Sequence, residues 1–479
     1  MNLSKKEKLA RMQRAFYPRN VAVVGAARHN NFMWIRNHLP FHQNHGKVFH
    51  VNIDKNEWPG AEALGVQCFA SLLDIPEPVD YVSISVPRQI VPRILEDCIK
   101  KDVATVHVYA AGFGESGEPE GIRLDGVISE MARKSGLLVI GPNCMGLFNP
   151  SVGIRQGSNQ YHGESGIVAY ISQSGSQATG FSLEADAHGV KISKSISMGN
   201  GLVLDVPDYL DYLAEDEETK AIGMFLEGTR DLRRFFRSLE EACKKKPVVV
   251  WKVGQTEDAA RATAAHTGTA YIREELWISL VDRCGALQVE SVEEMVETIK
   301  GVSLLPPVVG FNLGLMATTG GHSTEMASVF SKFGFKIPRL SEGSYQELGS
   351  FFNLQGSNYV NPVQTMRLTR ENYDRTLNIL MGDENVDLVV VEMSAGPLAQ
   401  SEEVLEQRVK AIKDAKGSSL KPAIVILASS FPRVDSSILD SIGRRFAREG
   451  IPAFYSFQRG AQALKRVVAY HFARSYLAK

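Results

Sequence analysis

A histidine and a glutamate near the middle of the chain have the residue types that covalent histidine catalysis needs. His266 lies in the segment Ala264-Ala265-His266-Thr267-Gly268-Thr269-Ala270, whose small side chains let a large anionic group approach the imidazole. Glu227 ends an apolar run that we predict as a strand. A buried carboxylate there can accept the Nδ1 proton and leave Nε2 as the nucleophile. The two residue types allow a catalytic pair, with His266 on a loop, but spacing alone favours an ordinary loop histidine.

Two glycine-containing segments follow apolar runs and have the composition of anion-binding turns. Ser172-Gln173-Ser174-Gly175-Ser176-Gln177 places hydroxyl groups and a glycine before a helical stretch. Such hydroxyls cap a helix, and its free amides and dipole favour an anion. Val23-Val24-Gly25-Ala26-Ala27-Arg28 allows a tight turn from a strand into a helix, whose first amides can hold a phosphate. The alternatives are an ordinary capping motif and a simple strand-to-helix turn.

A third irregular loop, Gly141-Pro142-Asn143-Cys144-Met145-Gly146, also follows an apolar run. Its composition fixes an unusual backbone at a strand end, which is where ligands bind in open α/β sheets. No histidine is near Cys144 in sequence to activate its thiol, so we interpret this cysteine as a packed side chain. No glycine stands between Gly25 and Gly46, so the GxGxxG fingerprint is absent. This absence disfavours an NAD-linked dehydrogenase.

The elements that must position these loops alternate short apolar runs with helical periods. Uninterrupted apolar strands beside amphipathic helices predict parallel sheets covered on both faces. We predict helices at 90–100 and 121–135, a linker at 304–307, and strands at 21–25, 47–52, 80–87, 137–142, 166–172, 221–226, 247–252, 308–318, 386–393 and 423–429. The pattern restarts twice, which predicts three α/β domains at residues 1–149, 150–303 and 304–479.

Composition limits the partners that the protein can have. The chain has 479 residues, 44% of them hydrophobic, and a net charge of −1, so no basic excess attracts nucleic acid or anionic lipid. The charged N-terminus does not resemble a signal peptide, and no apolar run is long enough to cross a bilayer. The cysteines are odd in number and never spaced as CxxC, which argues against disulfides and structural zinc. We expect a cytoplasmic protein that binds neither nucleic acid nor membranes.

Taken together and in this order, the segments resemble the α-type part of ADP-forming (NDP-forming) acyl-CoA synthetases, which are relatives of succinyl-CoA synthetase. The resemblance covers nearly the whole chain, and no single motif is decisive. Besides the loops at 141–146 and 172–175, it rests on Gly112-Phe113, Ser197-Met198-Gly199-Asn200, Leu226-Glu227-Gly228, Lys246-Pro247, His266-Thr267-Gly268, Thr319-Gly320-Gly321 and Asn361-Pro362-Val363.

The resemblance implies an N-terminal Rossmann-like, doubly wound CoA-binding domain followed by two flavodoxin-like domains of the succinyl-CoA synthetase type. It implies that His266 carries a phosphoryl group and that Glu227 orients the phosphohistidine. Ser174, Gly175 and Ser176 would bind the phosphate at a helix start. The residues expected to bind CoA are Gly25, Ala26, Ala27, Val86, Pro87, Asn143 and Cys144.

The family joins a carboxylic acid to CoA at the expense of ATP, through an acyl phosphate and the phosphohistidine. The histidine then exchanges its phosphoryl group with ADP on a separate ATP-grasp domain. No such module follows the third domain before Lys479. The resemblance therefore implies a heteromeric enzyme in which a β-type partner supplies the sites for ATP, ADP and Mg²⁺.

Four departures from the family pattern stand out. Bulky residues, Arg28 to Trp34, follow Gly25 where small residues are usual, which challenges ordinary binding of the CoA diphosphate. Thr269 stands where serine is common. Gly320-Gly321-His322-Ser323 replaces Gly-Gly-Pro-Gly, and Gln364 stands where the family favours aspartate. The altered first loop favours a rival function, a non-catalytic regulatory protein that binds CoA or acyl-CoA, whereas Glu227 and the His-Thr-Gly segment favour the enzyme.

Overall fold

Three mainly parallel sheets organise the chain in the computed structural model, which describes residues 3–267, 272–308, 310–352, 358–419, 421–428 and 434–477. The sheets belong to two compact units. The first comprises Met1–Leu183 and Lys191–Glu290, and it holds the first two sheets. The second comprises Glu184–Val190 and Ser291–Lys479, and it holds the third sheet.

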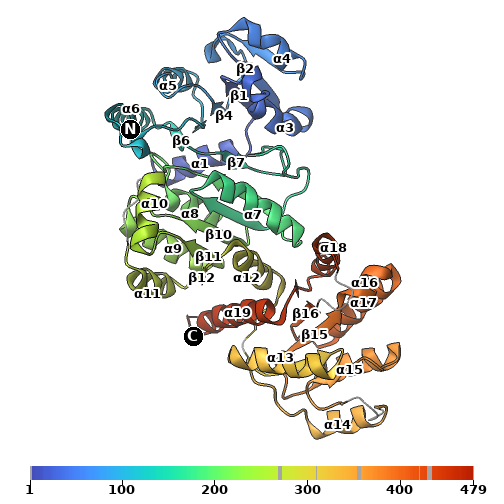
Figure 1. The fold of residues 1–479 in the computed structure, drawn as a ribbon. Coiled ribbons are helices and arrows are strands. Elements are labelled where there is room, and N and C mark those ends of the chain that lie inside the picture. Colours follow the sequence, from blue (N-terminus) through green and yellow to red (C-terminus); the bar gives the residue numbers. More distant parts are fainter. Residues whose placement is uncertain are drawn as a thin grey trace. The chain divides into compact units, whose positions relative to one another are not determined.

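The first sheet has the strand order of dinucleotide-binding folds. Its parallel strands run in the order β3 (Gln67–Phe69), β2 (Lys47–Val51), β1 (Asn20–Val24), β4 (Tyr81–Ile84), β5 (Thr105–Val108) and β6 (Leu138–Ile140). Its helices are α1 (Lys5–Phe16), α2 (Met33–Asn37), α3 (Leu39–Asn44), α4 (Trp58–Glu62), α5 (Val91–Lys100) and α6 (Pro119–Ser135). Figure 1 shows α5 and α6 on one side of the strands and α3 on the other. The order reverses between β1 and β4, which confirms the predicted Rossmann-like, doubly wound topology.

The second sheet combines a flavodoxin-like order with one antiparallel edge strand. The order is β12 (Leu287–Val289), β11 (Val248–Lys252), β10 (Ala221–Leu226), β8 (Val168–Ser172), β9 (Ile192–Ser197) and β7 (Gly146–Phe148). Only β7 is antiparallel, and it pairs with β9 although it precedes the domain boundary predicted at residue 150. The accompanying helices are α7 (Gly175–Ala187), α8 (Val206–Glu215), α9 (Leu232–Lys245), α10 (Glu257–Thr267) and α11 (Glu274–Cys284). Without β7, the strand order is that of flavodoxin, with its reversal between β8 and β10.

The third sheet repeats the flavodoxin-like order. Its parallel strands are β14 (Val363–Gln364), β13 (Leu313–Ala317), β15 (Leu388–Ser394), β16 (Ala423–Ala428) and β17 (Ala453–Phe454), and its reversal lies between β13 and β15. The helices of this unit are α12 (Val292–Leu304), α13 (Gly320–Lys332), α14 (Glu342–Gly349), α15 (Arg370–Gly382), α16 (Ala395–Gln400), α17 (Glu402–Ser419), α18 (Ser436–Ala447) and α19 (Phe457–Leu477). Helix α12 ends where the linker is predicted.

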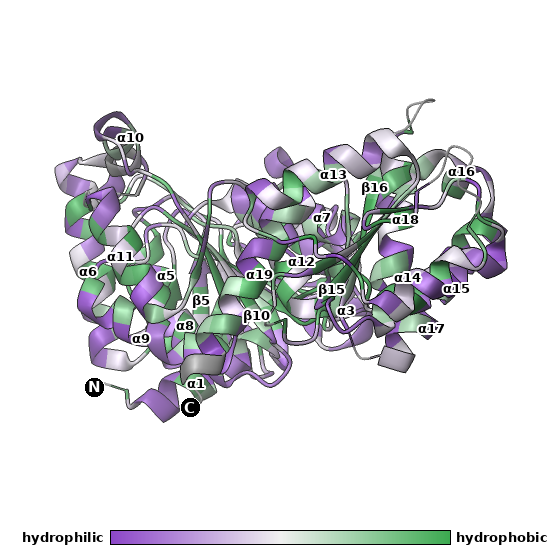
Figure 2. Cartoon of the chain, turned by 90° about the horizontal axis from the view of Figure 1, so that it is seen from below, coloured by the Kyte–Doolittle hydropathy of each residue, from purple (hydrophilic) through white to green (hydrophobic). Residues whose placement is uncertain are grey.

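Burial explains why these strands form. All residues of β8 and β10 are buried, as expected for strands that are covered by helices on both faces. Figure 2 shows strands such as β15 and β16 coloured hydrophobic, while α6 and α9 carry both hydrophobic and hydrophilic residues. Within the described ranges, none of the helices has both the length and the apolar character that a membrane span requires.

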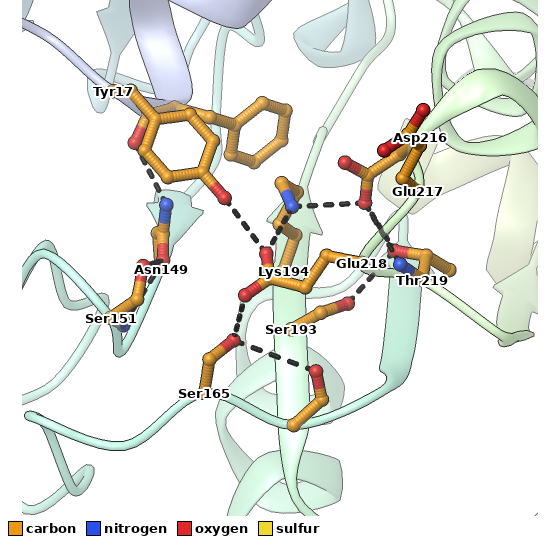
Figure 3. Close-up of polar contacts among 12 residues, drawn as sticks. Tyr17, Asn149, Ser151, Ser165, Ser193, Lys194, Asp216, Glu217, Glu218 and Thr219 are labelled. Carbon is orange, nitrogen blue, oxygen red and sulfur yellow. Dashed lines mark hydrogen bonds and ion pairs between the residues drawn. The ribbon is translucent and has the colours of Figure 1, made fainter.

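Strand β9 carries a buried lysine whose partners lie in other elements (Figure 3). The Nζ of Lys194 donates to Asp216 at 2.9 Å and to Glu218 at 2.6 Å. The hydroxyl of Tyr17, which follows α1, also donates to Glu218. Burial by itself favours the neutral carboxyl, but these hydrogen bonds lower the pKa of Glu218 below its ordinary value. The network therefore holds the end of α1 against the second sheet.

Candidate active site

His266 and Glu227 lie in direct contact at the carboxyl edge of the second sheet. Glu227 immediately follows β10, and its side chain is 4% exposed, whereas the imidazole of His266 is 51% exposed. The Nδ1 of His266 lies 2.7 Å from Oε1 of Glu227. In the neutral tautomer that donates this hydrogen bond, Nε2 keeps its lone pair. The geometry therefore provides a nucleophilic nitrogen that a buried carboxylate orients.

The prediction that His266 stands on a loop is wrong, because this residue belongs to the last turn of α10. The alanines between residues 259 and 265 are strong helix formers, and they extend the helix as far as Thr267. The hydroxyl of Thr256 accepts from the amide of Ala259 at its start. Gly268 and Thr269, which complete the predicted motif, lie outside the described residues.

The turn between β8 and α7 is tied directly to the glutamate. The side-chain oxygen of Gln173 accepts hydrogen bonds from the amides of Glu227 and Gly228, at 2.6 Å and 2.9 Å. Because β8 and β10 are parallel neighbours, the residues that follow them share one edge of the sheet. Ser174, Gly175 and Ser176 therefore open α7 on the same edge as Glu227.

Each of the three residues at the start of α7 has a local reason for its identity. The Ser174 hydroxyl accepts from the amide of Gln177 at 3.4 Å and lies 3.0 Å from the hydroxyl of Ser176. A Cβ at Gly175 would lie 2.6 Å from Cγ of Met145, so a larger residue would require the Met145 side chain or the helix start to shift. Hydroxyl groups at a helix N-terminus form a suitable anion site.

Lys252 is a site residue to which our sequence reasoning gave no role. It ends β11, beside Leu226, and its Nζ donates to the backbone oxygens of Glu227, at 2.9 Å, and of Val253. Burial lowers the pKa of Lys252 to about 8, against the attraction of Glu227, which acts in the opposite direction. The sequence pattern that could have indicated this residue is a lysine at the last position of an apolar strand. Burial of a cation there costs free energy unless the cation is paired or hydrogen-bonded.

A cavity of about 540 Å³ lies at the carboxyl edge of the first sheet, between the ends of β1 and β4. Three of the residues expected to bind CoA line it, namely Gly25, Val86 and Pro87. Gly25 has φ of +86°, and a Cβ there would lie 2.5 Å from the backbone oxygen of Ser85, so only glycine fits. Ala26 and Ala27 are buried beside it, and the backbone oxygen of Ala26 accepts from His50 and Asn52.

The bulky segment after Gly25 does not fill this cavity. Phe32 and Trp34 are buried in the hydrophobic core, at 5% and 1% exposure. The backbone amide of Arg28 donates to Glu57, and its guanidinium lies beside the same carboxylate. Of this segment, only His29 lines the cavity. The aromatic residues thus pack inward and leave the space at the strand ends open.

Asn143 and Cys144 do not line the cavity. Cys144 is buried, and burial raises the pKa of its thiol to about 12, as expected for a packed side chain rather than a nucleophile. The amide of Asn143 donates to Asn200, whose amide in turn donates to Glu115 at 2.6 Å. Glu115 belongs to a short 3₁₀ turn, Gly114–Ser116, which packs against α10. These residues therefore connect the first sheet to the helix that carries His266.

Comparisons with known proteins match the regions that form the first two sheets. Residues 19–150 match the family model described as a CoA binding domain, and residues 165–302 match the succinyl-CoA ligase like flavodoxin domain. The chain is 32% identical to the α subunit of acetate–CoA ligase [ADP-forming] II of Pyrococcus furiosus, over 92% of this chain and 93% of that subunit.

A longer relative and a solved structure extend the similarity. The chain is 32% identical to acetate–CoA ligase [ADP-forming] I of Archaeoglobus fulgidus over 95% of its own length, but it spans only 63% of that protein. Its fold matches the dinucleotide forming acetyl-coenzyme A synthetase 1 of Ca. Korarchaeum cryptofilum, solved in complex with phosphate and ADP. The TM-score is 0.83, with 28% identity and 98% of each chain covered.

Proposed function

The chain belongs to the family of ADP-forming acetate–CoA ligases, and from this premise we propose that it is the α-type subunit of an ADP-forming acyl-CoA synthetase. The overall reaction converts an acid, CoA and ATP into acyl-CoA, ADP and phosphate. The observation that carries the proposal is the 2.7 Å contact between His266 and the buried Glu227. A histidine held in this way can accept a phosphoryl group and return it.

In the direction of acyl-CoA formation, His266 receives the phosphoryl group of ATP at Nε2 and passes it to the carboxylic acid. The bond from phosphorus to the acid oxygen forms as the N–P bond breaks, and CoA then displaces phosphate from the acyl phosphate; in the reverse direction His266 takes the phosphoryl group back from the acyl phosphate. The Nδ1 proton stays on the imidazole, hydrogen-bonded to the carboxylate of Glu227. The carboxylate also stabilises the positive charge that the phosphorylated imidazole acquires. The start of α7, with Ser174, Gly175 and Ser176, supplies amides and hydroxyls to the phosphate oxygens. Lys252 fixes the backbone that carries Glu227 and adds a nearby cation.

The first sheet would bind CoA in the cavity between β1 and β4. Gly25 permits close approach of a ligand to the backbone, while His29 and Arg93 bring nitrogen donors to the same cavity. Among the described residues, Arg93 has no ion-pair partner, so its charge is available to a diphosphate. The inward packing of Phe32 and Trp34 supports CoA binding in spite of the altered loop.

A second subunit completes the proposed enzyme. The similar Pyrococcus protein is named as a subunit α, and the similar Archaeoglobus protein is longer than this chain. We assign the ATP and ADP sites and Mg²⁺ to an ATP-grasp β-type partner, and we expect a heteromeric oligomer in the cytoplasm.

A turnover assay separates the enzyme from a non-catalytic CoA-binding protein. The chain, mixed with a β-type ATP-grasp partner, ATP, acetate and CoA, should form acetyl-CoA. His266→Asn should abolish this activity, whereas His162→Asn, which removes an exposed histidine elsewhere in the same unit, should not. CoA binding without turnover in the wild-type complex, with acetate or with larger carboxylic acids, would favour the regulatory function.

A further inference from the structure

The strand order of the third sheet reverses in the same way as that of the second sheet. The proposed function assigns no role to the residues at this reversal. In the second sheet, the residues that follow β8 and β10 form the site with Ser174 and Glu227. In the third sheet, β13 and β15 take the same places in the order. Thr318 and Thr319 follow β13 and lead into α13, and Glu392 lies near the carboxyl end of β15. Ligands in open α/β sheets gather at such reversals.

This edge carries a second histidine–carboxylate pair. The Nδ1 of His322, in the first turn of α13, lies 3.2 Å from Oε1 of Glu392. The Glu392 side chain is fully buried, and its other oxygen accepts from the amide of Thr318 at 2.5 Å. The imidazole of His322 is 28% exposed. The buried carboxylate is thus anchored to the backbone and faces Nδ1, which leaves Nε2 as the reactive nitrogen.

Both facing atoms still lack a proper hydrogen bond. Their separation is short, but neither Nδ1 of His322 nor Oε1 of Glu392 has a well-oriented hydrogen-bond partner among the residues that the structure describes. Buried polar atoms without such a partner are costly, and they often indicate a site that completes its contacts when it is occupied. A small rotation of the imidazole, whose edge contacts the ring of Phe457, would align the pair.

The surroundings suit a phosphoryl group. A Cβ placed on Gly321 would meet nothing closer than the Thr319 hydroxyl at 3.9 Å, an ordinary contact distance, so no described neighbour crowds the helix start there. The side-chain amide of Gln364 would lie 3.3 Å from a Cβ on Gly320. A neutral amide and the first amides of the 13-residue α13 both favour an anion. Gln364, beside Gly320, and His322, in the first turn of the same helix, are therefore two departures from the family pattern at one helix start.

We propose that His322 is a second phosphoryl-accepting histidine, with Glu392 as its positioning residue and an acyl phosphate as the donor. Nε2 of His322 attacks phosphorus, the N–P bond forms, and the bond from phosphorus to the acyl oxygen breaks to release the carboxylate. The Nδ1 proton stays between the imidazole and Glu392, so no other proton acceptor is needed. The inference rests on the proposed function only in taking an acyl phosphate as the donor.

Labelling of the full chain with ³²P-acetyl phosphate, without ATP or a partner, tests this proposal. Phosphohistidine is recognised as label that is lost in acid and retained in alkali. We expect His266→Asn to keep part of the label and the double variant His266→Asn/His322→Asn to lose it. In the His266→Asn background, Glu392→Gln should lower the label about tenfold, because a hydrogen bond to a charged group is lost. Glu392→Asp should restore part of it.

Two controls keep the result interpretable. His162→Asn in the same background should retain the label, and thermal unfolding of each variant should match that of its parent. Complete loss of label in His266→Asn alone would overturn the inference while leaving the proposed function standing. Label that survives in the double variant would also overturn it. Loss in the double variant together with full retention in His266→Asn would instead contradict the role of His266.

Discussion

The proposed chemistry depends on the contrast between an exposed imidazole and a buried carboxylate. His266 must reach a phosphoryl donor, and half of its side chain is open to solvent. Glu227 must not exchange its partner for water, and it is held at the end of β10 by Gln173 and Lys252, which bind its backbone. A carboxylate in this position favours the charged, phosphorylated imidazole more strongly than a neutral amide would.

We predict that Glu227→Gln lowers kcat by about 10- to 100-fold, the equivalent of losing a charge-assisted hydrogen bond of about 1.5–3 kcal/mol. KM for CoA should stay unchanged, because the CoA cavity belongs to the first sheet. Steady-state kinetics with the β-type partner measure both parameters. An unchanged kcat would show that Glu227 is only a structural partner of His266.

The pKa of Lys252 predicts how the free energy of unfolding changes with pH. Its pKa is lowered to about 8 in the folded protein, from the ordinary 10.5, because burial disfavours the charged form. Between these two values the unfolded chain binds more protons at this residue than the folded chain does, so its contribution to stability rises with pH. The difference in unfolding free energy between wild type and Lys252→Met should therefore shift in favour of the wild type as pH rises from 8 to 10.5. Urea denaturation across this range measures it, and a constant difference would contradict the account.

At the scale of elements, β9 shows why part of the second sheet escapes sequence analysis. Four of its six residues are polar, yet all six are buried. Lys194 pairs with Asp216 and Glu218, which lie more than twenty residues away in the sequence. No short-range sequence pattern therefore predicts these contacts. The apolar strands β8 and β10, in contrast, are predicted correctly, because uninterrupted hydrophobic runs indicate buried strands by themselves.

We expect Lys194→Met to destabilise the first unit by about 3 kcal/mol, because it leaves two carboxylates without their buried cation. The additional substitution Glu218→Gln should recover part of this loss. Urea denaturation followed by tryptophan fluorescence provides the free energies of unfolding. A loss below about 1 kcal/mol would be typical of an exposed ion pair and would contradict the buried network.

Helix α5 supplies a test of the CoA cavity. Arg93, on its first turn, lines the cavity, whereas Arg123 on α6 pairs with Glu120 at the surface. We expect Arg93→Ala to weaken CoA binding about tenfold, which corresponds to about 1.4 kcal/mol, and Arg123→Ala to leave it unchanged. Isothermal titration calorimetry with CoA compares the two. Equal affinities in both variants would place the diphosphate elsewhere.

At the scale of the whole molecule, three sheets each bring a pair of strand ends together, and each pair holds a candidate site. The sequence predicted the three α/β regions, the doubly wound first sheet and most of the loops at these edges, because apolar runs and glycine turns are local signals. It could not predict that Phe32 and Trp34 turn into the core, that His266 belongs to a helix, or that β7 crosses to the second sheet. Each of these depends on packing partners that are distant in the chain.

The same limit applies to the residues of the sites. Glu227 and His266 are 39 residues apart, and the prediction of their pairing came from the family resemblance rather than from spacing. Asn143 and Cys144 follow a strand of the first sheet, yet Asn143 contacts Asn200 and Cys144 packs in the hydrophobic core, and neither lines the cavity. Which loop residues share a site is decided by strand order, and strand order is visible only in the folded molecule.

The most direct test of the central role of His266 is transfer of label from [γ-³²P]ATP. The chain is incubated with a β-type ATP-grasp partner and Mg²⁺, without acid or CoA, so that the phosphoryl group stops at the histidine. We predict acid-labile label on the wild-type chain and on His162→Asn, and none on His266→Asn. Label that persists in His266→Asn, or an unlabelled wild-type chain in a complex that forms acetyl-CoA, would contradict the account.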